Sequence, residues 1–267
     1  MHIPSEAAVE ETEEQIEARL NERFSILEAL VDASIDGTAR ALFVSGPPGL
    51  GKSFTVEKKL ENWDPDEMQH TKVKGYVRAT GLFRMLYKNR HPGNTLVFDD
   101  ADTIFFDETS LNLLKAVCDS NDRRVVSYLS EAVFIDSDEA TPIPNKFEFE
   151  GTIIFITNLD FDAMILKGHK LAPHLQALIS RAHYVDLSMR TTNDYIVRIK
   201  QVVRGGMLRD QGLTEEMEDD VMQFIDDHLE SLRELSLRMA MKIGALRKQN
   251  RPNWKAVASI TCCRNIA

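Results

Sequence analysis

The segment Gly46-Pro-Pro-Gly-Leu-Gly-Lys-Ser53 constrains the fold of this chain more than any other feature of its sequence. It fits the phosphate-loop pattern G-x-x-x-x-G-K-[ST] at every position. The apolar run Ala41–Ser45 leads directly into it and predicts a buried strand, and a helix is expected from Lys52 to about Asn62. A strand, a phosphate loop and a helix in this order predict an α/β domain built on a parallel sheet.

The residues of this loop have separate roles in holding nucleotide phosphates. Glycines allow the backbone N–H groups to point inward at the phosphates without interference from side chains. Lys52 places a positive charge on the β- and γ-phosphates, and the Ser53 hydroxyl ligates Mg²⁺. The residues expected to bind the nucleotide are Gly46, Pro47, Pro48, Gly49, Leu50, Gly51, Lys52, Ser53 and Phe54.

An acidic pair follows a second apolar run. Thr95–Phe98 predicts a buried strand, and Asp99 and Asp100 come directly after it. Ligands of open parallel sheets bind at the C-terminal ends of the strands. We therefore expect Asp99 to hold Mg²⁺ together with Ser53, and Asp100 to activate the attacking water as a general base.

The pattern of the remaining residues divides the chain into three parts. Strands alternate with helices up to Leu187, which predicts a parallel sheet with helices on both faces, and only helical periodicity follows. We expect an acidic helical segment (1–37), an α/β core (38–189) and a small helical lid (190–267). The other expected strands are 70–74, 124–129, 152–157 and 184–187, the segment 141–145 is expected to be a loop, and the other expected helices are 82–89, 111–118, 174–181, 193–204, 214–229 and 231–248.

Composition limits the kinds of partner that the chain can have. A formal net charge of -10 argues against a broad electrostatic grip on nucleic acid, which requires a basic surface. No apolar run is long enough to cross a bilayer and no basic-then-apolar leader opens the chain, so we expect no membrane partner. Cys262 and Cys263 are expected to be unpaired thiols rather than a redox pair. These features together predict a cytoplasmic protein.

The order of these motifs resembles that of the AAA+ ATPases over about residues 40–250. The chain is similar to the compact AAA+ proteins carried by bacteria and phages, with Gly46–Ser53 as Walker A and Leu96–Asp100 as Walker B. The resemblance implies that the nucleotide is ATP and that the chain forms a homo-oligomeric ring, a hexamer, which remodels a macromolecular substrate. It also assigns sensor 1 to Asn158, the arginine finger that reaches a neighbouring subunit to Arg181, and sensor 2 on the lid to Arg238.

One residue departs from the pattern of the family. Walker B usually ends in Asp-Glu, whereas here it ends in Asp99-Asp100, and the second carboxylate is one methylene shorter. Asp102 is a candidate to assist in hydrolysis. A nucleotide-dependent switch or scaffold with little turnover is therefore an alternative to the active ATPase that we expect.

The substrate class is suggested by the segment Lys74-Gly-Tyr-Val-Arg78, which lies where AAA+ proteins place their central pore loop. Gly-Tyr-Val resembles the pore loop of Clp-type unfoldases, which grip a threaded polypeptide through an aromatic side chain, although Arg78 replaces a second glycine. The alternative role for Tyr76 is to close a hydrophobic cluster with Phe83 and Leu86.

A nucleic-acid-associated ATPase, such as a helicase loader or a replication factor, is the alternative function. Basic residues gather around the same segment and would suit a phosphate backbone in a pore. They are Lys72, Lys74, Arg78, Arg84, Lys88 and Arg90. The long connection from Ser130 to Glu150 either carries a function or forms a solvated surface hairpin.

Overall fold

The computed structural model describes residues 11–129, 133–135, 141–249 and 252–265. The contacts divide the chain into two compact units: the first consists of residues 1–22, 48–50 and 189–267, and the second of residues 23–47 and 51–188. The helix expected in the N-terminal segment is α1 (Glu13–Ile35), which contributes residues to both units. The start of that segment, residues 1–10, lies outside the described residues.

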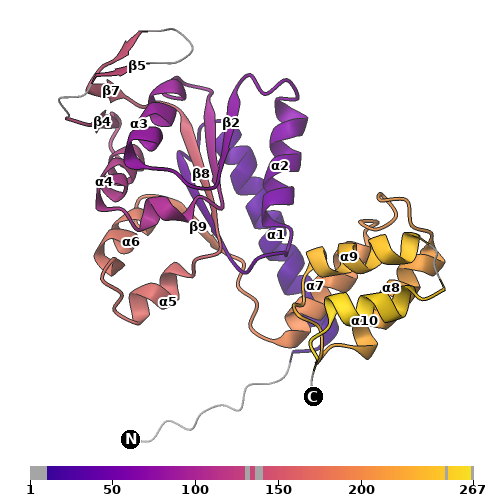
Figure 1. Ribbon diagram of the computed structural model, residues 1–267. Helices are drawn as coiled ribbons and strands as arrows, with labels where there is room; N and C mark the ends of the chain where they lie inside the picture. Colours follow the sequence, from indigo (N-terminus) through magenta and orange to yellow (C-terminus); the bar gives the residue numbers. More distant parts are fainter. Residues whose placement is uncertain (1–10, 130–132, 136–140, 250–251, 266–267) are drawn as a thin grey trace, which may run out of the picture. The chain divides into compact units, whose positions relative to one another are not determined.

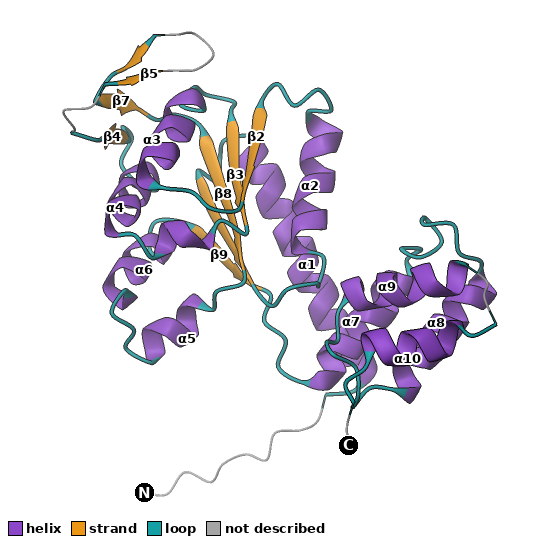
Figure 2. Cartoon of the chain, in the orientation of Figure 1, coloured by secondary structure: helices purple, strands orange, loops and turns teal. Residues whose placement is uncertain are grey.

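A five-stranded parallel sheet with the strand order β2-β3-β8-β1-β9 forms the second unit (Figures 1 and 2). Each of its strands was expected, and the bounds agree within one residue. They are β1 (Ala41–Ser45), β2 (His70–Lys74), β3 (Thr95–Asp99), β8 (Thr152–Thr157) and β9 (His183–Asp186). Because Ser45 pairs with Thr157 and Asp99 pairs with Ile156, the C-terminal ends of β1, β3 and β8 meet at one edge.

Successive residues of the central strands enter two separate cores, one on each face of the sheet. Phe43 stacks on Phe155 with ring centroids 4.5 Å apart, in the core that also contains residues of α3, α4, α5 and α6. Their neighbours Val44 and Ile154 lie in the other core, with residues of α1 and α2. This alternation produces three layers and confirms the α/β fold class (Figure 1). The covering helices are α2 (Lys52–Trp63), α3 (Ala79–Lys88), α4 (Glu108–Val117), α5 (Phe161–Leu166) and α6 (Ala172–Ile179).

Short elements of this unit differ from the expected ones. The helix α4 begins earlier than expected because Asp107 caps it, accepting from the Ser110 N–H at 2.8 Å. The expected helix 174–181 is α6, which ends at Ile179 and leaves Arg181 in the following turn. Neither α5 nor the 3-10 helix η1 (Asp102–Phe105) was expected, since elements this short show no complete hydrophobic period.

Two antiparallel strand pairs are inserted between α4 and β8 (Figure 2). The strand expected at 124–129 is the shorter β4 (Val125–Ser127), which pairs with β7 (Lys146–Glu148) outside the main sheet. The loop expected at 141–145 is wrong in part, because β6 (Pro142–Ile143) pairs with β5 (Phe134–Ile135). Residues 130–132 and 136–140 of this connection lie outside the described residues.

The first unit is helical where it is described. It contains α7 (Thr192–Arg204), α8 (Glu215–Asp227), α9 (Leu237–Lys248) and α10 (Trp254–Cys262) around a core that includes Phe224 and Ile243. The helix α9 begins later than expected, because the Ser236 hydroxyl accepts from the Met239 N–H at 3.1 Å and caps it, and α10 was not expected. Cys262 and Cys263 are buried free thiols. None of the described helices has both the length and the apolar character that crossing a bilayer demands.

Candidate functional site

The expected phosphate loop connects β1 to α2, and its three glycines all have a positive φ that side chains resist. Gly46 has φ +151°, and a Cβ added there would lie 3.1 Å from the backbone of Leu187. Gly51 has φ +96° and is the N-cap of α2. Glycine adopts positive φ without steric cost, so the loop can close tightly against the sheet and enter the helix at once. The N-terminus of α2 then presents backbone N–H groups that favour an anion.

The ammonium group of Lys52 is buried inside this loop. It donates to the carbonyl oxygens of Gly46 (2.6 Å) and Pro47 (2.8 Å), and to the side-chain oxygen of Asn158 (2.9 Å). The positive charge therefore lies between the loop backbone and the end of β8. This is the position from which a lysine can pair with phosphate oxygens that the loop encloses.

Ser53 and Asp99, the expected magnesium ligands, are in contact. The Ser53 hydroxyl donates to Asp99 Oδ1 at 2.8 Å, and the Asp99 side chain is only 1% exposed. In the described parts of the chain, no three His, Cys, Asp or Glu side chains cluster as a metal cage would require. Mg²⁺ commonly takes one or two protein ligands and completes its shell with waters and phosphate oxygens. The pair therefore fits this cation in a nucleotide-dependent site.

Asp100 and Asn158, the expected general base and sensor, are joined by a hydrogen bond. Asn158 Nδ2 donates to Asp100 Oδ1 at 2.8 Å, while Asn158 Oδ1 accepts from Lys52. Asp100 has φ +53°, in the left-handed region that aspartate tolerates better than most side chains. The left-handed backbone at this position suits aspartate, whose short polar side chain tolerates it better than longer side chains do.

Asp102, the alternative acid, is the first residue of η1 and contacts the last residue of β8. The Thr157 hydroxyl donates to Asp102 Oδ1 at 2.6 Å. Burial raises the pKa of Asp102 above its ordinary value, the Thr157 hydrogen bond opposes this, and the neighbouring Asp100 charge adds to it. Asp102 is therefore bonded to the last residue of β8, whereas Asp100 is exposed and bonded to Asn158.

The structure adds a residue to the site that we had not assigned to it. Lys74 Nζ lies 2.8 Å from Asp99 Oδ2 and 3.1 Å from Glu57 Oε1, and Lys72 also pairs with Glu57. The hydrogen bond to Asp99 raises the pKa of Lys74. Lys74 and Asp99 are partners in the register of β2 and β3. The signal in the sequence was a lysine at the end of one strand and an aspartate at the end of another, which becomes informative only once the strand order is known.

The contacts recorded for three other expected site residues, Arg181, Arg238 and Phe54, leave the roles expected of them as predictions. Arg181 is exposed just beyond α6 and donates to the Ala177 carbonyl at 2.6 Å. Arg238 is exposed at the start of α9, in the first unit, where its Cγ lies 3.8 Å from the place of a Cβ on Gly49. The Phe54 ring is 67% exposed and lies 5.8 Å from the Lys58 ammonium, so only the Phe54 backbone is suited to a phosphate.

The expected pore segment presents its aromatic side chain to solvent. Tyr76 is 72% exposed, while Phe83 and Leu86 are fully buried, so the alternative that Tyr76 closes a cluster with them is wrong. The backbone of the next residue, Val77, is hydrogen-bonded to Thr103: the Val77 N–H donates to Thr103 Oγ1 at 3.3 Å, and the Thr103 hydroxyl lies 3.4 Å from the Val77 carbonyl oxygen. An exposed Tyr76 ring beside a hydrogen-bonded Val77 backbone suits contact with another chain.

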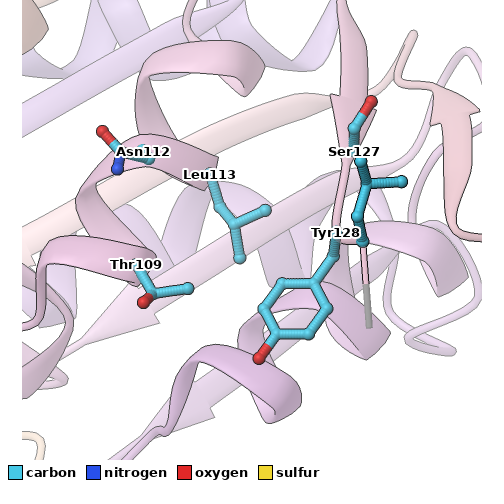
Figure 3. Close-up of a pocket in the computed structure, with 6 residues that line it drawn as sticks. Thr109, Asn112, Leu113, Ser127 and Tyr128 are labelled. Carbon is cyan, nitrogen blue, oxygen red and sulfur yellow. The ribbon is translucent and has the colours of Figure 1, made fainter. Parts of the chain in front are cut away.

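A separate hollow of about 340 Å³ lies between α4 and the end of β4 with the two residues that follow it. Figure 3 shows Thr109, Asn112 and Leu113 on the helix side and Ser127 and Tyr128 opposite. Its lining contains no Asp, Glu, His, Lys or Arg side chain, and none of its residues belongs to the expected site. The hollow offers no acid, base or cation for chemistry, and we assign it no role.

Comparison with known proteins gives one relative by sequence and several by fold. The chain is 33% identical over 253 residues to the "Uncharacterized 36.7 kDa protein in nrdC-mobD intergenic region" of Enterobacteria phage T4, covering 94% of this chain and 77% of that protein. No protein-family model matches the chain. The structure of NtrX from Brucella abortus in complex with ATP is similar with a TM-score of 0.53 at 12% identity, covering 93% of this chain and 55% of NtrX. RuvB of Thermotoga maritima has a TM-score of 0.48 at 13% identity, covering 91% and 68%. The likeness to NtrX supports the AAA+ fold expected from the motifs.

Proposed function

This chain belongs to the family of the phage T4 protein encoded between nrdC and mobD, and we propose that it is an AAA+ ATPase that binds and hydrolyses Mg-ATP. The observation that carries the proposal is the convergence of three strand ends. The phosphate loop after β1, the acidic pair at the end of β3 and the asparagine after β8 meet at one edge of the sheet, joined by the hydrogen bonds of Lys52, Ser53 and Asn158.

The residues of the chain would divide the work of hydrolysis. The loop and Lys52 orient the phosphates and offset their charge, while Asn158 holds Asp100 through a hydrogen bond. Asp100 is the exposed carboxylate that would accept the proton of the attacking water. Ser53 and Asp99 would hold Mg²⁺, which when bound neutralises charge on the phosphate oxygens. Arg238 on α9 is proposed as the sensor of the γ-phosphate.

We expect the active form to be a homo-oligomeric ring in which Arg181 acts on the nucleotide of the neighbouring subunit. Arg181→Ala should leave the affinity for a fluorescent ATP analogue within about twofold and lower ATP turnover at least about tenfold, because it removes a charge from the transition state only. Mixing Arg181→Ala with Lys52→Ala should restore activity. When equal amounts are mixed at random, about a quarter of the interfaces place the intact phosphate loop of an Arg181→Ala subunit against the intact arginine of a Lys52→Ala subunit.

The mixing experiment separates action in trans from action within one subunit. Turnover of the mixture, compared with each variant alone at the same total concentration, should rise toward that fraction of the wild-type rate. A mixture no more active than its components, or a single-subunit mass by light scattering with ATP present, contradicts the ring.

The proposed substrate is an unfolded polypeptide gripped by Tyr76. The exposed ring on an anchored loop supports this, and the nucleic-acid alternative loses two cations because Lys72 and Lys74 are paired with Glu57 and Asp99. We expect an unfolded polypeptide to stimulate ATP turnover of the purified chain several-fold and Tyr76→Ala to abolish the stimulation. Stimulation by single- or double-stranded DNA instead would favour the nucleic-acid alternative, and absence of turnover under all conditions would favour the switch or scaffold.

A further inference from the structure

We propose that Lys74 is a built-in competitor of Mg²⁺. Its ammonium group pairs with both Asp99 and Glu57, and it must give up Asp99 and keep Glu57 when the metal enters. The inference rests on the proposed function, because it concerns the same magnesium site. It assigns to Lys74 a regulatory role that differs from the nucleic-acid contact considered for it above. The consequence is that the cation concentration needed for nucleotide binding is set by this chain's own lysine.

Both oxygens of the Asp99 carboxylate are engaged. Oδ1 accepts from the Ser53 hydroxyl at 2.8 Å, and Oδ2 is paired with Lys74 Nζ at 2.8 Å. The carboxylate is 1% exposed, whereas the Lys74 side chain is 53% exposed. A divalent cation held by Ser53 and Asp99 would therefore meet an ammonium group already on the same carboxylate, and like charges this close repel.

Glu57 offers the displaced ammonium a second partner. It lies one turn after Ser53 on α2, and its Oε1 is 3.1 Å from Lys74 Nζ. Lys74 can leave Asp99 by a change of side-chain rotamer alone, since its backbone is held in β2 beside β3. The ammonium group therefore has two carboxylate acceptors, and one of them is also an expected magnesium ligand.

Lys72 provides the matched control. It lies two residues earlier on β2, so its side chain points to the same face, and it pairs with Glu57. The structure records Asp99 as a partner of Lys74, and Glu57 as a partner of both lysines. Lys72→Met and Lys74→Met therefore remove the same charge from the same network, and they differ in the contact with the magnesium ligand.

The test is a Mg²⁺ titration of the binding of a fluorescent ATP analogue to the full chain. Lys74→Met should lower the half-saturating Mg²⁺ concentration about three- to tenfold. This lies between the effect of losing an exposed ion pair and that of losing a hydrogen bond to a buried charge, because Lys74 is half-exposed and Asp99 is buried. Lys72→Met should shift it less than about twofold. Glu57→Gln should raise it, because Lys74 then keeps only Asp99 as a carboxylate partner.

The outcomes separate this inference from the proposed function. If the wild-type chain does not bind the analogue at any Mg²⁺ concentration, the proposed function fails. If the wild-type chain binds the analogue but Lys74→Met leaves the half-saturating Mg²⁺ concentration unchanged or raises it, only the role of Lys74 is overturned. The same holds if Lys72→Met lowers this concentration as much as Lys74→Met does. Circular dichroism verifies that each variant folds, and Lys74→Gln replaces the methionine variant if that one does not.

Discussion

Lys52→Ala is expected to weaken the binding of a fluorescent ATP analogue about a thousandfold and to abolish turnover. The ammonium is buried within the loop and donates to the carbonyls of Gly46 and Pro47 and to Asn158. In the complex it would exchange these neutral acceptors for charged phosphate oxygens. Two charge-assisted hydrogen bonds at about 2 kcal/mol each amount to about three orders of magnitude in affinity.

A second lysine on the same helix distinguishes this effect from a general loss of positive charge. Lys58 is exposed and lies over the Phe54 ring at 5.8 Å, so Lys58→Ala should change the affinity less than twofold. Fluorescence titrations of both variants with Mg²⁺ present provide the comparison. If Lys52→Ala binds the ATP analogue with an affinity within tenfold of the wild type, the loop is not the nucleotide-binding site.

The sheet could be predicted from the sequence because its strands carry their own signals. Strands of a parallel sheet are buried on both faces, and Ala41–Ser45 and Thr152–Thr157 are accordingly continuous runs of small or apolar residues. The phosphate loop was equally predictable, since its pattern specifies glycines where the backbone needs positive φ and a lysine where the charge is required. These signals are local, so a single sequence contains them.

Features that depend on contacts between residues distant in the chain could not be predicted from the sequence. The contact between Lys74 and Asp99 follows from the order of β2 beside β3, which no local pattern encodes. The same limit applied to β6, which forms by pairing with β5 and reads as a proline-containing loop by itself. The left-handed backbone of Asp100 was hidden for a related reason, because the turn after β3 is shaped by its bond to Ile156 (Asp100 N–H to carbonyl, 3.1 Å).

The second large effect is expected for Asp100→Asn, which should lower ATP turnover about a thousandfold while leaving the affinity for the ATP analogue within about threefold. Asparagine has the size of aspartate and retains an oxygen that can accept from Asn158 Nδ2, so the geometry at this strand end is kept. It lacks the carboxylate that accepts a proton from water, and a general base contributes about 10² to 10⁴ in rate. Steady-state turnover and equilibrium binding, measured on the same preparation, separate the two steps.

Asp102→Asn decides whether Asp100 or its neighbour is the base. The Asp102 carboxylate already accepts from the Thr157 hydroxyl at 2.6 Å, so its loss should lower turnover less than about tenfold. If the two variants exchange their effects, Asp102 is the base. The pH–rate profile would then give independent evidence. Burial raises the pKa of Asp102, so as the pH is lowered, turnover would fall at a pH above the ordinary aspartate pKa of about 4. A loss of turnover in Asp100→Asn alone, with Asp102→Asn nearly as active as the wild type, would mean that the shorter Asp100 carboxylate serves as the base.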